Sequence, residues 1–194
     1  QKAVSVVQIP QSPFKRRIMR CLMTRKILLT SQGIQPEIEK DFLALLDKSP
    51  EDTQICFVVT AAYGEEKNPV WLNVYKEQLQ RLGITSISDI DIKDKNQSEL
   101  EELLKNTDVI FMNGGNTFYL LYWMKKTGFD KLVHRHINSG RLYVGVSAGS
   151  YVACPTIEMA NWKHQDRNNI GIADLSALNL VPFLLTVHFE EKYR

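Results

Sequence analysis

Short apolar runs alternate with amphipathic segments along the chain from Lys26 onward. Most of these runs are continuous and rich in β-branched residues, which is typical of strands buried on both faces of a parallel sheet. We predict strands over residues 26–31, 54–61, 84–92, 108–112, 142–146 and 181–188.

Apolar residues recur at helical spacing in the segments between these runs. Pro36 lies in the first turn of one such segment, and Gly83 directly follows another, as expected for the start and the end of helices. We predict helices over residues 36–46, 69–82, 98–105, 117–126 and 130–138, and a further helix start at 150–154. Alternating strands and helices predict a single α/β domain, with one parallel sheet covered by helices on both sides.

The composition agrees with one globular domain. The chain has 194 residues, of which 44% are hydrophobic and 24% charged, and this excludes collagen-like, coiled-coil and wholly disordered proteins. The longest uncharged runs, such as residues 142–157, contain polar residues and are shorter than the roughly 20 apolar residues that cross a bilayer. Cys21, Cys56 and Cys154 cannot all pair with one another and lack metal-like spacing. We therefore expect reduced thiols and a cytoplasmic location.

The first 22 residues differ from the rest of the chain. Seven of the 24 basic residues precede Glu37, the first acidic residue, and residues 1–22 contain two prolines. A targeting leader, an upstream extension and a non-native remnant remain open, and we favour a dispensable, disordered extension before a domain over 23–194. The remaining 17 basic and 22 acidic residues give no electrostatic reason to expect nucleic-acid binding.

A G-x-S-x-G sequence, Gly145-Val146-Ser147-Ala148-Gly149, follows the predicted strand 142–146 directly. Glycines on both sides of a serine allow the sharp turn that raises its hydroxyl above the sheet. The amides at the start of the next helix can stabilise negative charge on a tetrahedral intermediate. The pattern predicts Ser147 as a nucleophile.

A glycine-rich segment, Gly114-Gly115-Asn116-Thr117, follows the neighbouring predicted strand. Paired glycines let the backbone approach a substrate, and their N–H groups can form part of an oxyanion hole. The alternative is a tight turn in which Asn116 only caps the following helix.

A serine nucleophile needs a base, and His188 is the histidine placed to supply it. It follows the apolar run 181–187, at the end of a predicted strand, although a purely structural role remains open. We expect His134 and His136 to be solvated on a surface helix and His164 to lie in a loop.

Together these residues resemble the peptidase E family of serine dipeptidases, which cleave after N-terminal aspartate and have cyanophycinases as relatives. The resemblance runs from about Lys26 to Phe189, and three segments carry it: Asn113-Gly114-Gly115-Asn116-Thr117-Phe118, the elbow at Ser147 continuing to Pro155-Thr156, and residues 177–189. It implies a single-domain α/β fold, a parallel-sheet sandwich like that of the class I glutamine amidotransferases, which is flavodoxin-like.

The resemblance also implies roles for individual residues. Ser147 matches the nucleophile and His188 the general base, while Gly115 and Ala148 would form the oxyanion hole. We assign Asn116 to substrate binding. No metal or organic cofactor is required.

The chain departs from the family pattern at the acidic member of the triad. Where relatives commonly carry an acidic residue, this sequence has Met159-Ala160-Asn161-Trp162. The acid is therefore unassigned, with Asp166, Asp174, Glu158 and a position beyond Arg194 as candidates.

Two further departures lie near the C-terminal histidine. Thr186 and Val187 replace the family's proline and asparagine before His188. The resemblance also places the arginine that recognises the substrate's aspartate in a segment past His188, of which this chain holds six residues.

These observations favour a serine peptidase acting on short peptides, with N-terminal aspartyl dipeptides as the implied substrates. The alternative is a non-catalytic member that binds peptides or small molecules with an incomplete triad. As partners we expect a small peptide substrate, no nucleic acid and no membrane, and we leave a homodimer open.

Overall fold

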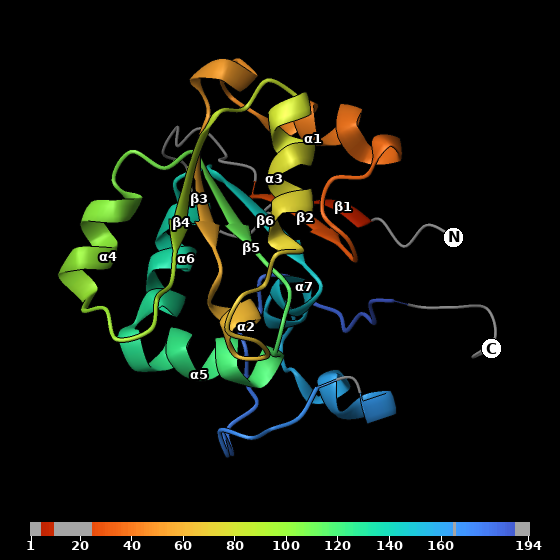
Figure 1. The fold of residues 1–194 in the computed structure, drawn as a ribbon, viewed down its shortest axis with the longest axis vertical. Helices are drawn as coiled ribbons and strands as arrows, with labels where there is room; N and C mark the ends of the chain where they lie inside the picture. The colour runs from red at the N-terminus through yellow and green to blue at the C-terminus, as the bar shows by residue number, and fades with distance from the viewer. Residues whose placement is uncertain (1–4, 10–24, 165, 189–194) are drawn as a thin grey trace, which may run out of the picture.

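A computed structural model describes residues 5–9, 25–164 and 166–188 of the chain. Its strands form one sheet in the order β1-β2-β6-β5-β3-β4 (Figure 1). Neighbours from β2 to β4 pair in parallel, and β1 pairs antiparallel with β2 at one edge. The bounds are Ser5–Ile9 for β1, Arg25–Thr30 for β2, Gln54–Val58 for β3, Ser86–Ile90 for β4, Val109–Met112 for β5 and Leu142–Val146 for β6.

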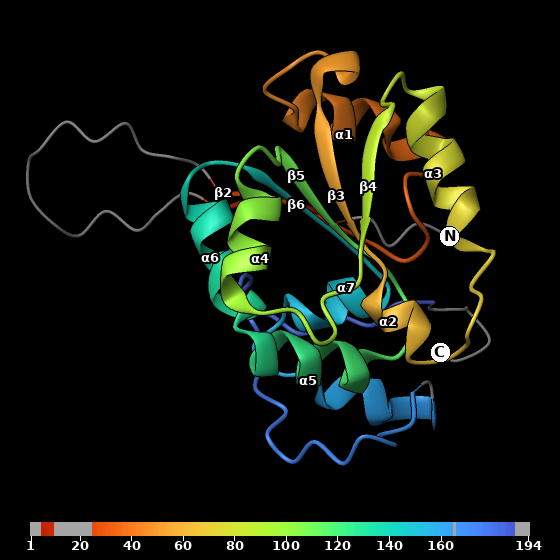
Figure 2. The same ribbon diagram turned by 60° about the vertical axis from the view of Figure 1, so that its left-hand side comes forward.

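Helices cover both faces of this sheet (Figure 2). They are α1 (Glu39–Leu45), α2 (Thr60–Tyr63), α3 (Leu72–Arg81), α4 (Gln97–Leu104), α5 (Thr117–Thr127), α6 (Phe129–Asn138) and α7 (Ala148–Val152), with 3-10 turns at Pro36–Ile38, Pro50–Asp52 and Glu158–His164. In β3, Phe57 packs in the apolar cluster with α1 and α3, whereas Cys56 packs with α4 to α7. Because side chains alternate along a strand, a strand buried on both faces must be apolar throughout. The predicted α/β fold with one central sheet is confirmed.

The strand predicted over 54–61 ends earlier, because the chain turns into α2 after Val58. The hydroxyl of Thr60 donates a 2.8 Å hydrogen bond to Asp91 Oδ1 and accepts one of 2.9 Å from the Ile92 amide. Buried Ala61 and Ala62 then form the short helix at the carboxyl end of β3. Continuous apolarity does not separate this buried helix from the strand before it.

The strand predicted over 181–188 is wrong, since that segment belongs to no strand. Leu180 and Val181 instead donate backbone hydrogen bonds to the carbonyl of Ala153, which follows α7. Val181 and Val187 are buried against the core without joining the sheet. The apolar run therefore reflects burial of irregular backbone against α7.

The predicted N-terminal extension over 1–22 contains β1, so Ser5–Ile9 is paired and not disordered. The rest of that segment lies outside the described residues, and its dispensability remains a prediction. No helix within the described residues has the length and apolar character needed to cross a membrane.

Two expectations for histidines are corrected by the structure. His136 is 5% exposed, with Nε2 3.1 Å from the carbonyl oxygen of Leu142, so it is buried in α6 and not solvated. His134 is half-buried, and His164 lies at the end of a 3-10 turn where a loop was expected.

Candidate active site

The carboxyl ends of β5 and β6 bring the two glycine-containing segments together. Figure 1 shows α2, α5 and α7, the helices that follow β3, β5 and β6, gathered at this end of the sheet. A Cβ added to Gly114 would lie 3.1 Å from Cβ of Ser147, so these backbones are in close approach. Ligand sites of open α/β sheets form at this edge.

Ser147 occupies the sharp turn that the sequence predicts. Its backbone lies at φ 50° and ψ −108°, and the carbonyl oxygen of Thr30 accepts its N–H at 3.0 Å. A Cβ at Gly145 would lie 2.5 Å from the Gly149 carbonyl oxygen, and one at Gly149 would lie 2.1 Å from that of Met112. Both glycines are therefore required by close packing, and together they fix a strained serine at the start of α7.

His188 lies directly beside this serine, although it comes from irregular backbone. Its Nε2 is 2.9 Å from Ser147 Oγ. The amide of His188 donates to Ser31 Oγ at 3.4 Å, and the preceding amide of Val187 donates to the hydroxyl of Tyr151 at 3.3 Å. Partial burial lowers the pKa of His188, and the charge of Asp166 opposes that shift. A neutral imidazole at pH 7 can accept the serine proton at Nε2.

Asp166 is the acidic candidate that the structure brings to His188. Its Oδ2 accepts a 2.9 Å hydrogen bond from the amide of Thr117, the first residue of α5. Burial raises the pKa of Asp166, while the bonds from Thr117 and the charge of His188 lower it. The carboxylate and the imidazole therefore act on each other electrostatically.

The other two acidic candidates lie elsewhere. Asp174 is exposed and forms a 2.6 Å ion pair with Lys125. Glu158 is exposed at the start of a 3-10 turn and does not line the cavity described below.

The glycine-rich segment docks on α2. The amide of Asn116 donates to the carbonyl oxygen of Ala61 at 2.9 Å, and a Cβ at Gly115 would lie 2.2 Å from the same carbonyl group. Gly115 has φ 122°, a conformation that L side chains rarely adopt. Only glycine fits this close approach.

Of the two expected oxyanion donors, Gly115 lines the same cavity as Ser147, and Ala148 directly follows Ser147 in the chain. Within the described residues neither N–H has a hydrogen-bond acceptor. Backbone N–H groups without acceptors, placed beside a nucleophile, suit an oxyanion.

The structure gives Asn116 the capping role that was the alternative to substrate binding. Its Oδ1 accepts from the Tyr119 amide at 2.9 Å, and its Nδ2 donates to the Arg167 carbonyl oxygen at 2.9 Å. Both ends of the amide are engaged within the chain, and substrate binding by Asn116 remains a prediction.

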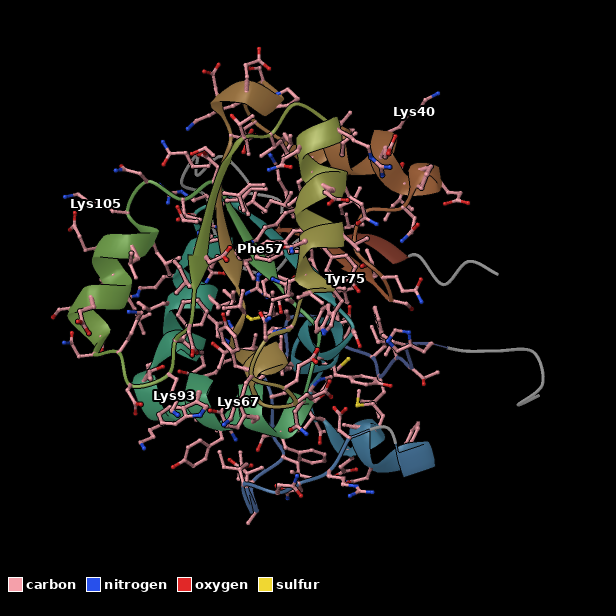
Figure 3. All side chains as sticks on the ribbon, in the orientation of Figure 1. Lys40, Phe57, Lys67, Tyr75, Lys93 and Lys105 are labelled. Atoms are coloured by element: carbon pink, nitrogen blue, oxygen red, sulfur yellow. The ribbon has the colours of Figure 1, made fainter. Side chains whose placement is uncertain are left out.

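Gly114, Gly115, Ser147, Asp166 and His188 line one cavity of about 360 Å³. Its lining also includes four residues that no sequence motif indicated: Glu65, Trp71, Tyr75 and Tyr151. Tyr75, labelled in Figure 3, comes from α3. These residues belong to loops and helices that are far apart in the sequence. Only the fold brings them to the cavity of Ser147. In the part of the chain that is described, no cluster of three His, Cys, Asp or Glu is placed to hold a metal.

Comparison with known sequences points to one family. The sequence profile of peptidase family S51 matches residues 27–194. An uncharacterized peptidase from Listeria monocytogenes is 32% identical over 153 residues, which cover 77% of this chain and 74% of the relative. A peptidase E from Nostoc sp. is 39% identical over 88 residues, 45% of this chain and 35% of that protein.

Solved structures agree with the fold. The crystal structure of a candidate peptidase E protein from Listeria monocytogenes is similar with a TM-score of 0.71 and 30% identity, over 81% of this chain and 76% of that one. A peptidase from an acI-B1 Actinobacterium has a TM-score of 0.65 at 21% identity, over 86% and 69% of the two chains. The second similarity bears on the fold alone.

Proposed function

Since the chain belongs to peptidase family S51, we propose that it is a serine peptidase that hydrolyses short peptides, with Ser147 as nucleophile and His188 as general base. The observation that carries this proposal is the 2.9 Å contact between Ser147 Oγ and His188 Nε2 in the cavity. It supports a serine primed to lose its proton to a neutral imidazole.

The reaction follows from this geometry in two halves. His188 Nε2 takes the proton of Ser147 as Oγ attacks the peptide carbonyl, and the N–H groups of Gly115 and Ala148 bind the oxyanion. The imidazolium then protonates the leaving amine, and the C–N bond breaks to leave an acyl-serine. Water attacks that ester with His188 again as base, which releases the acid and restores the hydroxyl.

We assign the acidic role to Asp166. Its charge raises the pKa of His188 and so stabilises the imidazolium that forms during each half-reaction. The position that is commonly acidic in relatives carries Trp162, which is 54% exposed. This departure favours the second candidate, a binding protein of the same fold, and Asp166 is the observation that weighs against it.

N-terminal aspartate as the preferred substrate residue remains a prediction from the family resemblance. The arginine that the resemblance implies falls past His188, outside the described residues. The cytoplasmic location and the homodimer likewise remain predictions.

Hydrolysis of Asp-Leu, Glu-Leu, Ala-Leu and Leu-Leu by the wild type and by Ser147→Ala tests the proposal. We expect cleavage of at least one dipeptide and a loss of about 10⁴-fold or more in kcat in the variant, with its circular dichroism unchanged. Cleavage of Asp-Leu alone would support aspartate specificity. Full activity of Ser147→Ala would rule out this nucleophile.

A further inference from the structure

Glu65 lines the same cavity as Ser147, yet the reaction described above does not use it. Its carboxylate has neither a hydrogen bond nor an ion pair with any residue in the described part of the chain. The adjacent carboxylate of Glu66 differs, since it accepts a 2.5 Å hydrogen bond from Trp71 Nε1. Glu65 is therefore available to a ligand in the cavity.

Helix α2 fixes where Glu65 lies relative to the oxyanion hole. The Glu65 amide donates to the Ala62 carbonyl oxygen at 3.0 Å, and the ring of Tyr119 packs where a Cβ of Gly64 would stand. The neighbouring carbonyl of Ala61 holds the glycine-rich segment through the amide of Asn116. The short helix α2 thus positions both Gly115, one of the two proposed oxyanion donors, and the backbone of Glu65.

The charge around Glu65 favours a cation. Glu65 and Asp166 both line the cavity, and none of its described lining residues is a lysine or arginine. Partial burial raises the pKa of Glu65, and so do the negative charges of Asp166 and Glu66. A bound cation would relieve this repulsion. Asp166 already accepts from Thr117 and its charge acts on His188, so Glu65 is the carboxylate left for the ligand.

Short unblocked peptides carry such a cation next to the bond that is cut. The α-ammonium group, with a pKa of about 8, is bonded to the same Cα as the carbonyl carbon of the first peptide bond. Bond lengths and angles place it roughly 2.5 Å from that carbon. When the carbonyl reaches Ser147, the ammonium group must therefore lie inside the same cavity.

We propose that Glu65 binds the α-ammonium group of the substrate and thereby selects peptides with a free amino terminus. This inference rests on the proposed function, because it takes a peptide carbonyl at Ser147 as its starting point. Glu65, which follows the C-terminal end of α2, then determines specificity and takes no part in bond cleavage.

Binding to the inactive variant tests the proposal without turnover. Isothermal titration calorimetry would use the full chain carrying Ser147→Ala, with Ala-Leu and N-acetyl-Ala-Leu as probes. Because a hydrogen bond to a charged group is at stake, we expect Ala-Leu to bind at least about tenfold more tightly. Adding Glu65→Gln should weaken Ala-Leu by about the same factor and leave the acetylated probe unchanged.

Glu66→Gln is the matched control, since it removes the same charge one residue away. It should keep the preference for Ala-Leu. Equal affinity of the parent for both probes, no measurable binding of Ala-Leu, or an unchanged preference in Glu65→Gln would overturn the proposal. If N-acetyl-Lys-Leu bound as tightly as Ala-Leu, the proposal would also be overturned. The cavity would then recognise the ammonium group of a side chain and not that of the amino terminus. A serine that proves unreactive would refute the peptidase mechanism while leaving these binding results interpretable.

Discussion

His188 lies where burial and a carboxylate act on its imidazole in opposite directions. Burial lowers its pKa and the charge of Asp166 raises it, with burial the larger influence. The base is therefore neutral at pH 7, as proton transfer from Ser147 requires. Once the imidazole has taken up the proton, the negative charge of Asp166 attracts and stabilises the imidazolium.

The pH dependence of catalysis follows from this balance. We expect kcat/KM to rise with pH through a pKa below the ordinary histidine value of about 6.5. Asp166→Asn removes the charge that raises this pKa, so the acidic limb should move to lower pH. kcat should fall by about 10²–10⁴-fold, because the imidazolium loses its stabilising charge. Measured pH–rate profiles of both proteins decide this, and an acidic limb that moves to higher pH in the variant would contradict the account.

At the scale of elements, the short helix α2 organises the site more than its four residues suggest. Its buried alanines lie under the glycine-rich segment, and the Ala61 carbonyl accepts the amide of Asn116. Gly115 has no room for a side chain, because a Cβ there would lie 2.2 Å from that carbonyl. Close packing of α2 against this segment therefore fixes the position of Gly115 on the lining of the cavity that holds Ser147.

Gly115→Ala should push α2 and the glycine-rich segment apart. The added methyl must displace α2 or the loop, and the loss of one oxyanion donor lowers kcat by about 10²–10³-fold. Gly171→Ala is the control, since Gly171 also has a positive φ of 69° but a Cβ there meets nothing within 4 Å. Steady-state kinetics would measure kcat of both variants, and urea unfolding would measure their stability. A normal kcat in Gly115→Ala would contradict the assignment of Gly115 to the oxyanion hole.

Across the whole molecule, the candidate active site and the buried histidine His136 lie at opposite ends of the sheet. Ser147 follows the carboxyl end of β6, whereas His136 bonds to Leu142 at the opposite end of that strand. Burial lowers the pKa of His136 to about 4. This histidine remains neutral in the core over the pH range in which an exposed one would take up a proton.

His136 should make the fold acid-sensitive. Between pH 6.5 and 4 the unfolded chain binds a proton that the folded chain does not, so stability falls as pH falls. The free energy of unfolding should drop by about 3 kcal/mol from this group between pH 7 and 4. In His136→Leu this contribution to the pH dependence should disappear, even if stability at pH 7 is lower. Urea titrations at pH 7, 5.5 and 4 measure the free energy of unfolding of both proteins. An identical change of that free energy with pH in the wild type and in His136→Leu would refute the prediction.

Much of this arrangement was predictable from local patterns. Strands buried on both faces are continuous apolar runs, and a serine between glycines after such a run marks a tight turn. Both signals belong to a few adjacent residues, so the sequence could single out Ser147 and Gly115, which the structure places on the lining of one cavity. The structure also places His188, predicted as the base, beside Ser147, although the strand expected to carry it does not form.

The remaining parts depend on contacts between distant segments. Asp166 lies in irregular backbone, and the sequence offers no reason to prefer it over the other acidic candidates. Only the fold brings it to the cavity that His188 lines. Glu65 has no motif at all, and only the packing of α2 brings it to the cavity. The apolar run 181–187 is buried but does not pair with the sheet. An apolar run indicates burial alone, so the sequence pattern could not distinguish this segment from a strand.

The most direct test of the central claim is the reaction of the full chain with a fluorophosphonate, with the labelled residue located by mass spectrometry. An activated serine beside a neutral imidazole should be labelled rapidly at Ser147, and labelling should vanish in Ser147→Ala and slow sharply in His188→Ala. Absence of labelling at Ser147, or equally fast labelling without His188, would contradict the assignment of a serine nucleophile activated by this histidine.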